Sequence, residues 1–209
     1  FSDFVRCCLD YFNGNCGYNK TYKNIDDVME RFLTVVFLVW MCYLSLPART
    51  YIVSVGIADY PGRQNDLRVS ANDAKTISGI FTKNGNATVE CFVNSDVTIK
   101  KVCTAMRNTF AKASPSDAII LYFSGHGVPG GLVCYDGVLY YSSVLSIMRQ
   151  SKAQQKMIFV DACFAGKMRN TNKRNTNYSK ENVMFFLSSR SMEKSLETPR
   201  QTGFKNSLF

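Results

Sequence analysis

Apolar and polar positions along the chain exchange in a regular way that predicts strands and helices in turn. Apolar runs of strand length lie at residues 51–57, 88–93, 118–123, 156–161 and 183–187. Apolar residues at helical spacing lie between them, at residues 66–81, 97–110 and 142–150. Asp136 and Gly137 predict the turn of a hairpin. The runs at 118–123 and 156–161 are continuous, which is typical of parallel strands covered on both faces. The pattern predicts a three-layer α/β/α sandwich around a mostly parallel sheet.

The first 48 residues follow a different pattern. Residues 1–28 are polar and show no periodicity, and an apolar run follows at residues 32–46. This run is short for a membrane span and has the length of a signal-peptide core. We interpret residues 1–28 as an extension outside the fold, with Met29 as the natural start. Residues 29–48 are then a signal peptide, or alternatively a membrane anchor, and residues 49–209 form the domain. The mature protein is expected to be secreted or periplasmic and to have no membrane segment.

Charge and cysteine spacing exclude several classes of protein. The chain has a net charge of +9, and residues 49–209 hold 21 basic against 11 acidic side chains. The largest local excess lies in one linker, at residues 166–182, so the charge does not indicate a nucleic-acid site. Cys91, Cys103, Cys134 and Cys163 show no C-x-x-C spacing, so we expect no metal site and no cofactor. The helical pattern places Cys103 in the core.

The single histidine, His126, stands in a glycine-rich bend, YFSGHGVPGG, that directly follows an apolar run. The bend contains the spacing G-x-G-x-x-G, which occurs in dinucleotide-binding turns. That fold requires a helix directly after the glycines and an acidic residue about 20 positions later. Here a hairpin follows, and residues 138–160 contain no Asp or Glu. The dinucleotide interpretation therefore fails.

A catalytic histidine explains the bend better. The run at 156–161 ends at Asp161, and Cys163 follows two residues later. If the two runs are parallel strands, both end at the same edge of the sheet, where ligand sites of such sheets lie. The pattern then predicts a Cys163 thiolate as nucleophile and the His126 imidazole as its proton partner. Because the histidine precedes the cysteine, the order matches caspases rather than papain-like enzymes.

Three segments carry a family resemblance: residues 55–77, 122–127 and 158–166. They read VGIADYPGRQNDLRVSANDAKTI, YFSGHG and IFVDACFAG, and they resemble the signature blocks of caspase-like cysteine peptidases, in the metacaspase and paracaspase branch. The likeness extends from Tyr51 to the end of the chain. It implies a caspase–haemoglobinase fold.

The resemblance also implies roles for individual residues. His126 would be the general acid/base and Cys163 the nucleophile, and the N–H groups of Gly127 and Cys163 would form the oxyanion hole. Asp73 and Asp161 match the acidic pair that selects Arg or Lys, and Ser124 matches a further position in that pocket. The expected function is therefore an endopeptidase that cleaves protein or peptide substrates after Arg or Lys. The alternative is a catalytically silent caspase-like module that binds or scaffolds.

The sequence also departs from the family pattern. Phe164 and Ala165 stand where most metacaspases have His-Ser. The acidic cluster that binds calcium in relatives is missing, which leaves Asp136, so we expect no calcium requirement. The family continues through a further helix and strand beyond QTGFKNSLF, which predicts that the domain is truncated at its C-terminus.

The linker at residues 166–182 is polar and rich in asparagine, and it predicts a surface loop. Its net charge of +4 is typical of a solvated loop. It also contains the basic residues that the proposed pocket would select, at the place where caspase relatives separate their subunits. We therefore predict self-cleavage at Arg169, Lys173 or Arg174.

Overall fold

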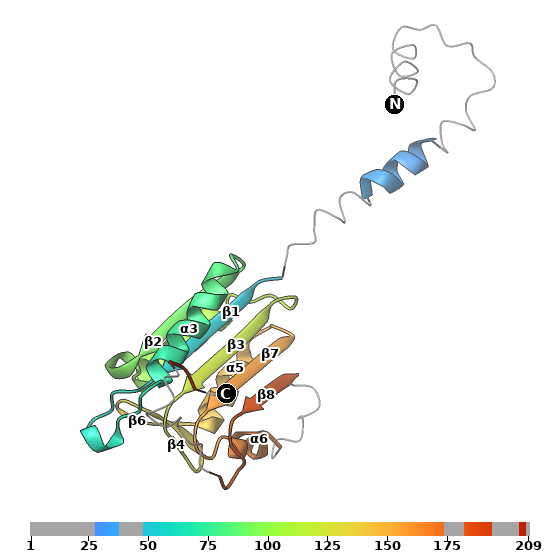
Figure 1. Ribbon diagram of the computed structural model, residues 1–209. Helices are drawn as coiled ribbons and strands as arrows, with labels where there is room; N and C mark the ends of the chain where they lie inside the picture. The colour runs from blue at the N-terminus through green and yellow to red at the C-terminus, as the bar shows by residue number, and fades with distance from the viewer. Residues whose placement is uncertain (1–27, 38–47, 174–181, 194–204, 208–209) are drawn as a thin grey trace, which may run out of the picture. The chain divides into compact units, whose positions relative to one another are not determined.

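The computed structural model describes residues 28–37, 48–173, 182–193 and 205–207 (Figure 1). The chain divides into two units, Phe1–Pro47 and Ala48–Phe209. Of the predicted N-terminal segments, residues 1–27 and 38–47 lie outside the described residues.

The larger unit is built on a five-stranded sheet in the order β2-β1-β3-β7-β8. Its strands are β1 (Thr50–Gly56), β2 (Ala87–Val93), β3 (Ala118–Ser124), β7 (Gln155–Asp161) and β8 (Val183–Leu187). Every neighbouring pair is parallel. All five predicted strands therefore form, and the parallel sheet is confirmed.

Helices cover both faces of this sheet. α3 (Ser70–Lys83) lies on one face, and α4 (Ile99–Phe110) and α5 (Tyr141–Gln150) lie on the other (Figure 1). Alternate residues of β1 reflect this arrangement. Val53 and Val55 belong to the core formed with α4 and α5, whereas the Ser54 hydroxyl donates to the Ala74 carbonyl of α3 at 2.9 Å. The predicted α/β/α layering is therefore correct.

Two details of these layers differ from the prediction. α3 begins at Ser70 rather than at residue 66, because Asp66 accepts a hydrogen bond from the Tyr60 N–H (3.1 Å) and the Leu67 N–H donates to Ala58 (2.7 Å). These bonds hold the preceding residues in a loop. In addition, β3 is buried along its length from Ile119, but one face of β7 is not. Phe159 of β7 stays partly exposed and stacks on Phe186 of β8, with ring centroids 4.4 Å apart.

Short elements complete the unit. A small antiparallel sheet contains β4 (Gly127–Val128), β5 (Gly131–Cys134) and β6 (Gly137–Tyr140). The turn between β5 and β6 is the predicted hairpin. Single 3₁₀ turns lie at η1 (Arg63–Asn65) and η2 (Asn94–Asp96). Cys103 of α4 is buried, as expected.

The prediction that residues 166–173 lie in a surface loop is wrong. They form the helix α6 (Gly166–Lys173), which packs against α5. Met168 is fully buried in the core, and the Gly166 N–H donates to the Ser189 carbonyl at 3.0 Å. A side chain at position 166 would collide with the backbone of Arg190 and Ser191. One buried methionine leaves no periodic pattern, which explains why the helix was missed.

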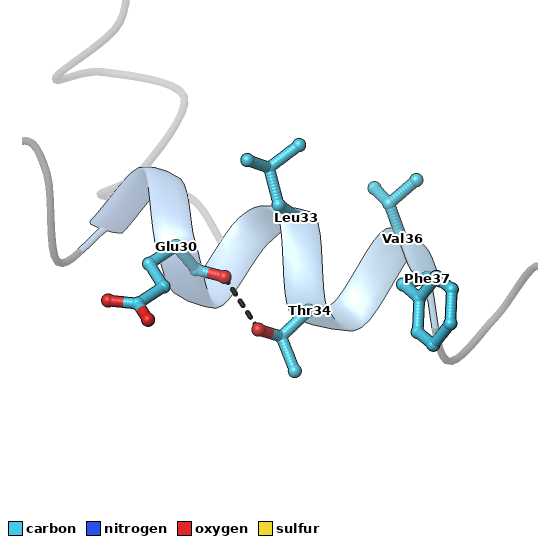
Figure 2. A pocket seen from close by; sticks show the side chains of 5 residues that line it. All are labelled: Glu30, Leu33, Thr34, Val36 and Phe37. Carbon is cyan, nitrogen blue, oxygen red and sulfur yellow. Dashed lines mark hydrogen bonds between the residues drawn. The ribbon is translucent and has the colours of Figure 1, made fainter.

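In the smaller unit, residues 28–37 form a helix (Figure 2). The Thr34 hydroxyl donates to the Glu30 carbonyl at 2.7 Å. The apolar side chains are exposed on all sides, and they include Met29, Phe32 and Leu33. Among the described residues, no helix has both the length and the apolar character that crossing a membrane requires.

Candidate active site

His126 and Cys163 both follow strand ends at the carboxyl edge of the sheet. Ser124 at the end of β3 is in register with Asp161 at the end of β7. The Gly125 N–H continues the pairing and donates to the Asp161 carbonyl at 3.1 Å. A cavity of about 110 Å³ opens at this edge, and His126 and Cys163 both line it. The fold therefore brings His126 and Cys163 to one cavity at this edge.

Two neighbours fix the orientation of His126. Its Nε2 atom lies 2.7 Å from the Asn65 carbonyl oxygen, at the end of η1. Because a carbonyl oxygen only accepts, Nε2 must carry a proton, and Nδ1 is then the nitrogen that can take a proton in the neutral ring. The ring of Tyr60 lies beside the imidazole, with centroids 4.7 Å apart. The Tyr60 hydroxyl accepts from the His126 N–H at 2.8 Å and donates to the Val133 carbonyl at 3.2 Å.

Neither neighbour of the histidine was predictable from the sequence. Asn65 acts through its backbone carbonyl, which any residue carries, so its side chain gives no signal. Tyr60 is one tyrosine among eleven and stands in a loop. Its tight fit is visible only in space, because a side chain at Gly125 would meet the Tyr60 hydroxyl at 2.6 Å.

Cys163 is half-buried in a tight turn that directly follows β7. Phe164 has a φ of 58°, which is uncommon for a residue with a side chain. Such a conformation persists only where the surroundings enforce it, and it is found at functional sites. The Phe164 N–H donates to the Glu193 carbonyl at 2.9 Å, and its carbonyl accepts from the buried Tyr141 hydroxyl at 3.3 Å.

Two serines that follow β8 hold the same turn. The Ser189 hydroxyl accepts from the Ala165 N–H at 3.0 Å and donates to the Ala162 carbonyl at 2.7 Å. It therefore joins the residues on both sides of Cys163. The Ser188 hydroxyl accepts from the Ala162 N–H at 3.2 Å. These contacts could not be predicted, because the serines lie 25 and 26 residues after the cysteine.

Gly127 packs directly on the backbone of the turn that contains Cys163. A Cβ atom at this position would lie 2.1 Å from the Cys163 carbonyl oxygen. Only glycine allows this approach, which brings the residue after the histidine beside the cysteine. The role of the Gly127 and Cys163 N–H groups as an oxyanion hole stays a prediction.

The three predicted pocket residues, Ser124, Asp161 and Asp73, lie close to one another at the same edge of the sheet. Ser124 and Asp161 line the cavity. Asp73, on the first turn of α3, is only 3% exposed, and its Oδ2 accepts from the Ser124 hydroxyl at 3.1 Å. Its Oδ1 accepts from the Ser207 N–H at 2.9 Å. Burial raises the pKa of Asp73, these donors oppose the rise, and the nearby Asp161 carboxylate adds to it.

The structure changes the account of the predicted self-cleavage residues. Arg169 is exposed but lies inside α6, and Lys173 is the last residue of that helix. The expectation that both lie in a loop is therefore wrong. Arg174 lies outside the described residues. Within residues 28–37, 48–173, 182–193 and 205–207, no group of three or more His, Cys, Asp or Glu side chains is placed to hold a metal ion.

Comparison with known proteins identifies the family of the chain. A family model described as the caspase domain matches residues 49–208. Among solved structures, the crystal structure of a structural-genomics target protein from Geobacter sulfurreducens is similar, with 18% sequence identity and a TM-score of 0.49. The match covers 60% of this chain and 55% of that protein, so the chain spans about half of its length. No curated protein matches the chain.

Proposed function

The chain belongs to the caspase domain family, a family of cysteine peptidases, and from this premise we propose that it is an endopeptidase of the metacaspase and paracaspase type that cleaves after Arg or Lys. One observation carries the proposal. The thiol of Cys163 and the imidazole of His126 line one cavity at the sheet edge, where Ser124 and Asp161 also lie. The buried carboxylate of Asp73 is hydrogen-bonded to that Ser124.

In the proposed reaction, Nδ1 of His126 takes the proton of the Cys163 thiol. The thiolate attacks the scissile carbonyl carbon, and a C–S bond forms as the carbonyl π pair moves to oxygen. The N–H groups of Gly127 and Cys163 then donate to the oxyanion. When the C–N bond breaks, the imidazolium returns the proton to the leaving amine. Water, deprotonated by His126, hydrolyses the thioester and restores the thiol.

The hydrogen bond from Nε2 to Asn65 supports this assignment of the proton. It fixes the ring so that Nδ1 is the basic atom. It also holds Nε2–H toward a carbonyl oxygen, which stabilises the imidazolium that forms during the reaction.

Two acidic side chains support selection of basic residues. Carboxylates removed from water are costly unless a cation or hydrogen-bond donors compensate them. The nearby Asp161 carboxylate disfavours ionisation of Asp73 and so raises its pKa further. An Arg or Lys side chain in the cavity would relieve this repulsion. A substrate with Asp at the cleavage position would increase it.

Peptidyl-Arg and peptidyl-Lys reporters test the proposal. Cys163→Ala and His126→Ala should each lower kcat/KM by about 10³-fold or more, because each removes one member of the dyad. Cys91→Ala is the matched control, since Cys91 is an exposed thiol on β2 outside the site. Hydrolysis that survives in either dyad variant would overturn the assignment. If the wild type neither hydrolyses the reporters nor reacts with an electrophilic peptidyl-arginine probe, the protein is instead a silent binding module.

We also propose that the enzyme cleaves itself after Lys173 or Arg174, directly after the end of α6. The charge of the linker supports this, since it concentrates the residues that the pocket would select. The helical bounds of α6 argue against Arg169. Intact-mass spectrometry should show a nicked wild type and an intact Cys163→Ala protein. A wild type that hydrolyses a reporter but stays in one piece would contradict self-cleavage.

Export from the cytoplasm is proposed on the basis of the helix at residues 28–37. Its apolar side chains are exposed on all sides, as in a segment that enters a translocation pore or a lipid surface. N-terminal sequencing of protein from the culture medium or periplasm should place the mature end near Ala48. Protein that keeps residues 29–47 in the membrane fraction would instead indicate an anchor.

A further inference from the structure

The start of α3 binds a segment far away in the sequence, residues 205–207. The Asn72 side-chain amide donates to the Lys205 carbonyl at 2.8 Å and to the Asn206 side-chain oxygen at 2.5 Å. The Thr76 hydroxyl donates to the same Asn206 oxygen at 3.3 Å. In Figure 1 this short segment, at the red end of the colour bar, lies beside the lower end of α3.

These contacts bring Ser207 into the wall of the active-site cavity. Ser207 lines the cavity together with His126 and Cys163. Its N–H donates to Oδ1 of Asp73, whose Oδ2 already accepts from Ser124. Both oxygens of this buried carboxylate are therefore held by residues that line the cavity. The donor on one side comes from β3 and the donor on the other side comes from the segment at residues 205–207.

We propose that Ser207 is a specificity-determining residue, which holds the Asp73 carboxylate in place for a basic substrate side chain, and that Asn72 positions it by fixing Lys205. This deepens the proposed function and rests on it. A backbone N–H can hold a carboxylate oxygen without adding positive charge, so the carboxylate keeps its attraction for a cation. Each oxygen also keeps a further acceptor site for the substrate.

The same contact favours the ionised form of Asp73. Burial raises the pKa of Asp73, and the N–H of Ser207 is the largest of the contributions that oppose this rise. Without that donor, the neutral form of the carboxyl would be favoured up to a higher pH. A neutral Asp73 offers little attraction for Arg or Lys. Loss of the contact should therefore reduce the preference for basic residues rather than the chemistry at Cys163.

Two substitutions at Ser207 separate the backbone contact from the side chain. Ser207→Pro removes the N–H, whereas Ser207→Ala keeps it. Asn72→Ala removes the clamp on Lys205, and Asn108→Ala is its control, because Asn108 is an exposed asparagine on a different helix, α4. The readout is kcat/KM for a peptidyl-Arg reporter divided by that for the corresponding peptidyl-Gln reporter.

This ratio should fall about tenfold in Ser207→Pro and in Asn72→Ala, as expected from the loss of one charge-assisted hydrogen bond. It should change by less than about threefold in Ser207→Ala and stay unchanged in Asn108→Ala. When this ratio is plotted against pH, it falls at acid pH as Asp73 becomes protonated. This fall should occur at a higher pH in Ser207→Pro and in Asn72→Ala than in the wild type. An unchanged ratio, or an equal loss on both reporters, would overturn the inference.

Binding of benzamidine separates this inference from the proposed function. If the wild type hydrolyses neither reporter, the peptidase proposal fails, and the Kd for benzamidine still tests the pocket. It should then rise about tenfold in Asn72→Ala relative to Asn108→Ala. If the wild type hydrolyses both reporters equally and binds no benzamidine, the peptidase stands and the inference on Ser207 is overturned.

Discussion

Two aspartates are almost fully buried in the larger unit, one at each end of the sheet, and their surroundings differ. Asp117 precedes β3 at the amino edge and is 6% exposed, and Asp73 stands at the carboxyl edge and is 3% exposed. The Asp117 carboxylate accepts from the N–H of Arg49 and from the N–H and hydroxyl of Ser114, each at 2.7 Å. These donors, led by Arg49, lower its pKa, whereas burial raises the pKa of Asp73.

The two aspartates differ in how far the fold itself compensates the buried charge. Asp117 joins the start of β1 to the turn before β3, so its ionised form is compensated within the fold. Asp73 also has hydrogen-bond donors, but burial outweighs them, and a second carboxylate, Asp161, lies nearby. A carboxyl group that the fold does not fully compensate is available to a cation from outside. A raised pKa beside the cavity marks Asp73 as a candidate functional group, whereas the lowered pKa of Asp117 is the shift expected of a structural carboxylate.

The largest expected difference between the two aspartates is in catalysis. Asp73→Asn should lower kcat/KM for peptidyl-Arg reporters by about 100-fold, since it removes a buried charge that would pair with the substrate. Asp117→Asn, at the far edge of the sheet, should change it by less than about twofold. Steady-state kinetics on both variants decides this. Equal losses would contradict the separation of roles.

Stability should show the reverse order. Asp117→Asn should lower the free energy of unfolding by about 2 kcal/mol, because it weakens hydrogen bonds to a buried charged group. Asp73→Asn should cost less than about 1 kcal/mol at neutral pH, since the neutral amide avoids the repulsion from Asp161. Urea denaturation followed by circular dichroism measures both. A larger loss for Asp73→Asn would mean that Asp73 is primarily a structural residue.

Ser189→Ala sharpens the contrast within the carboxyl edge. It removes the hydroxyl that joins Ala162 to Ala165 across the nucleophile turn and should cost about 1 kcal/mol of stability. A less well-held Cys163 should also lower kcat about tenfold with little change in KM. Ser143→Ala is a control, because Ser143 is exposed on α5. An unchanged kcat in Ser189→Ala would contradict a positioning role.

The contributions of Asp117 and Asp73 to the free energy of unfolding should depend on pH with opposite signs. We expect this effect to be smaller than those of the substitutions above. The pKa of Asp117 is lowered on folding, so its contribution is present above its unfolded pKa and is lost as the pH falls through the folded value. The pKa of Asp73 is raised, so its contribution is present below the unfolded pKa and is lost as the pH rises through the folded value. Unfolding of wild type, Asp117→Asn and Asp73→Asn between about pH 3 and 7 tests these signs. Slopes of the same sign for both differences would contradict them.

Much of the fold follows from the sequence because its signals are local. The apolar runs of β1, β3 and β7 are continuous, and α3 ends at Lys83, two residues after the predicted helical spacing ends. α6 was missed because, among its residues whose burial is described, Met168 is the one buried in the core. The partial exposure of Phe159 on β7 was not predicted, because whether a strand is covered depends on the elements beside it rather than on its own residues.

The residues of the site also divide into those that local sequence signals predict and those that they do not. His126 and Cys163 could be predicted because each directly follows a strand, and parallel strands bring such residues to one edge. Asn65 was not predictable, because its contribution is a backbone carbonyl. The serines after β8 and Ser207 were not predictable either, because their contacts depend on how distant segments return to the site.

The most direct test of the central claim is to identify the bonds that the protein cuts. Wild type and Cys163→Ala are each incubated with a library of peptides, and mass spectrometry identifies the new termini. The account predicts that the wild type produces termini after Arg and Lys, and that the variant produces none. Cleavage by the wild type after Asp, or identical termini from both proteins, would contradict the claim that Cys163 acts beside an acidic pocket.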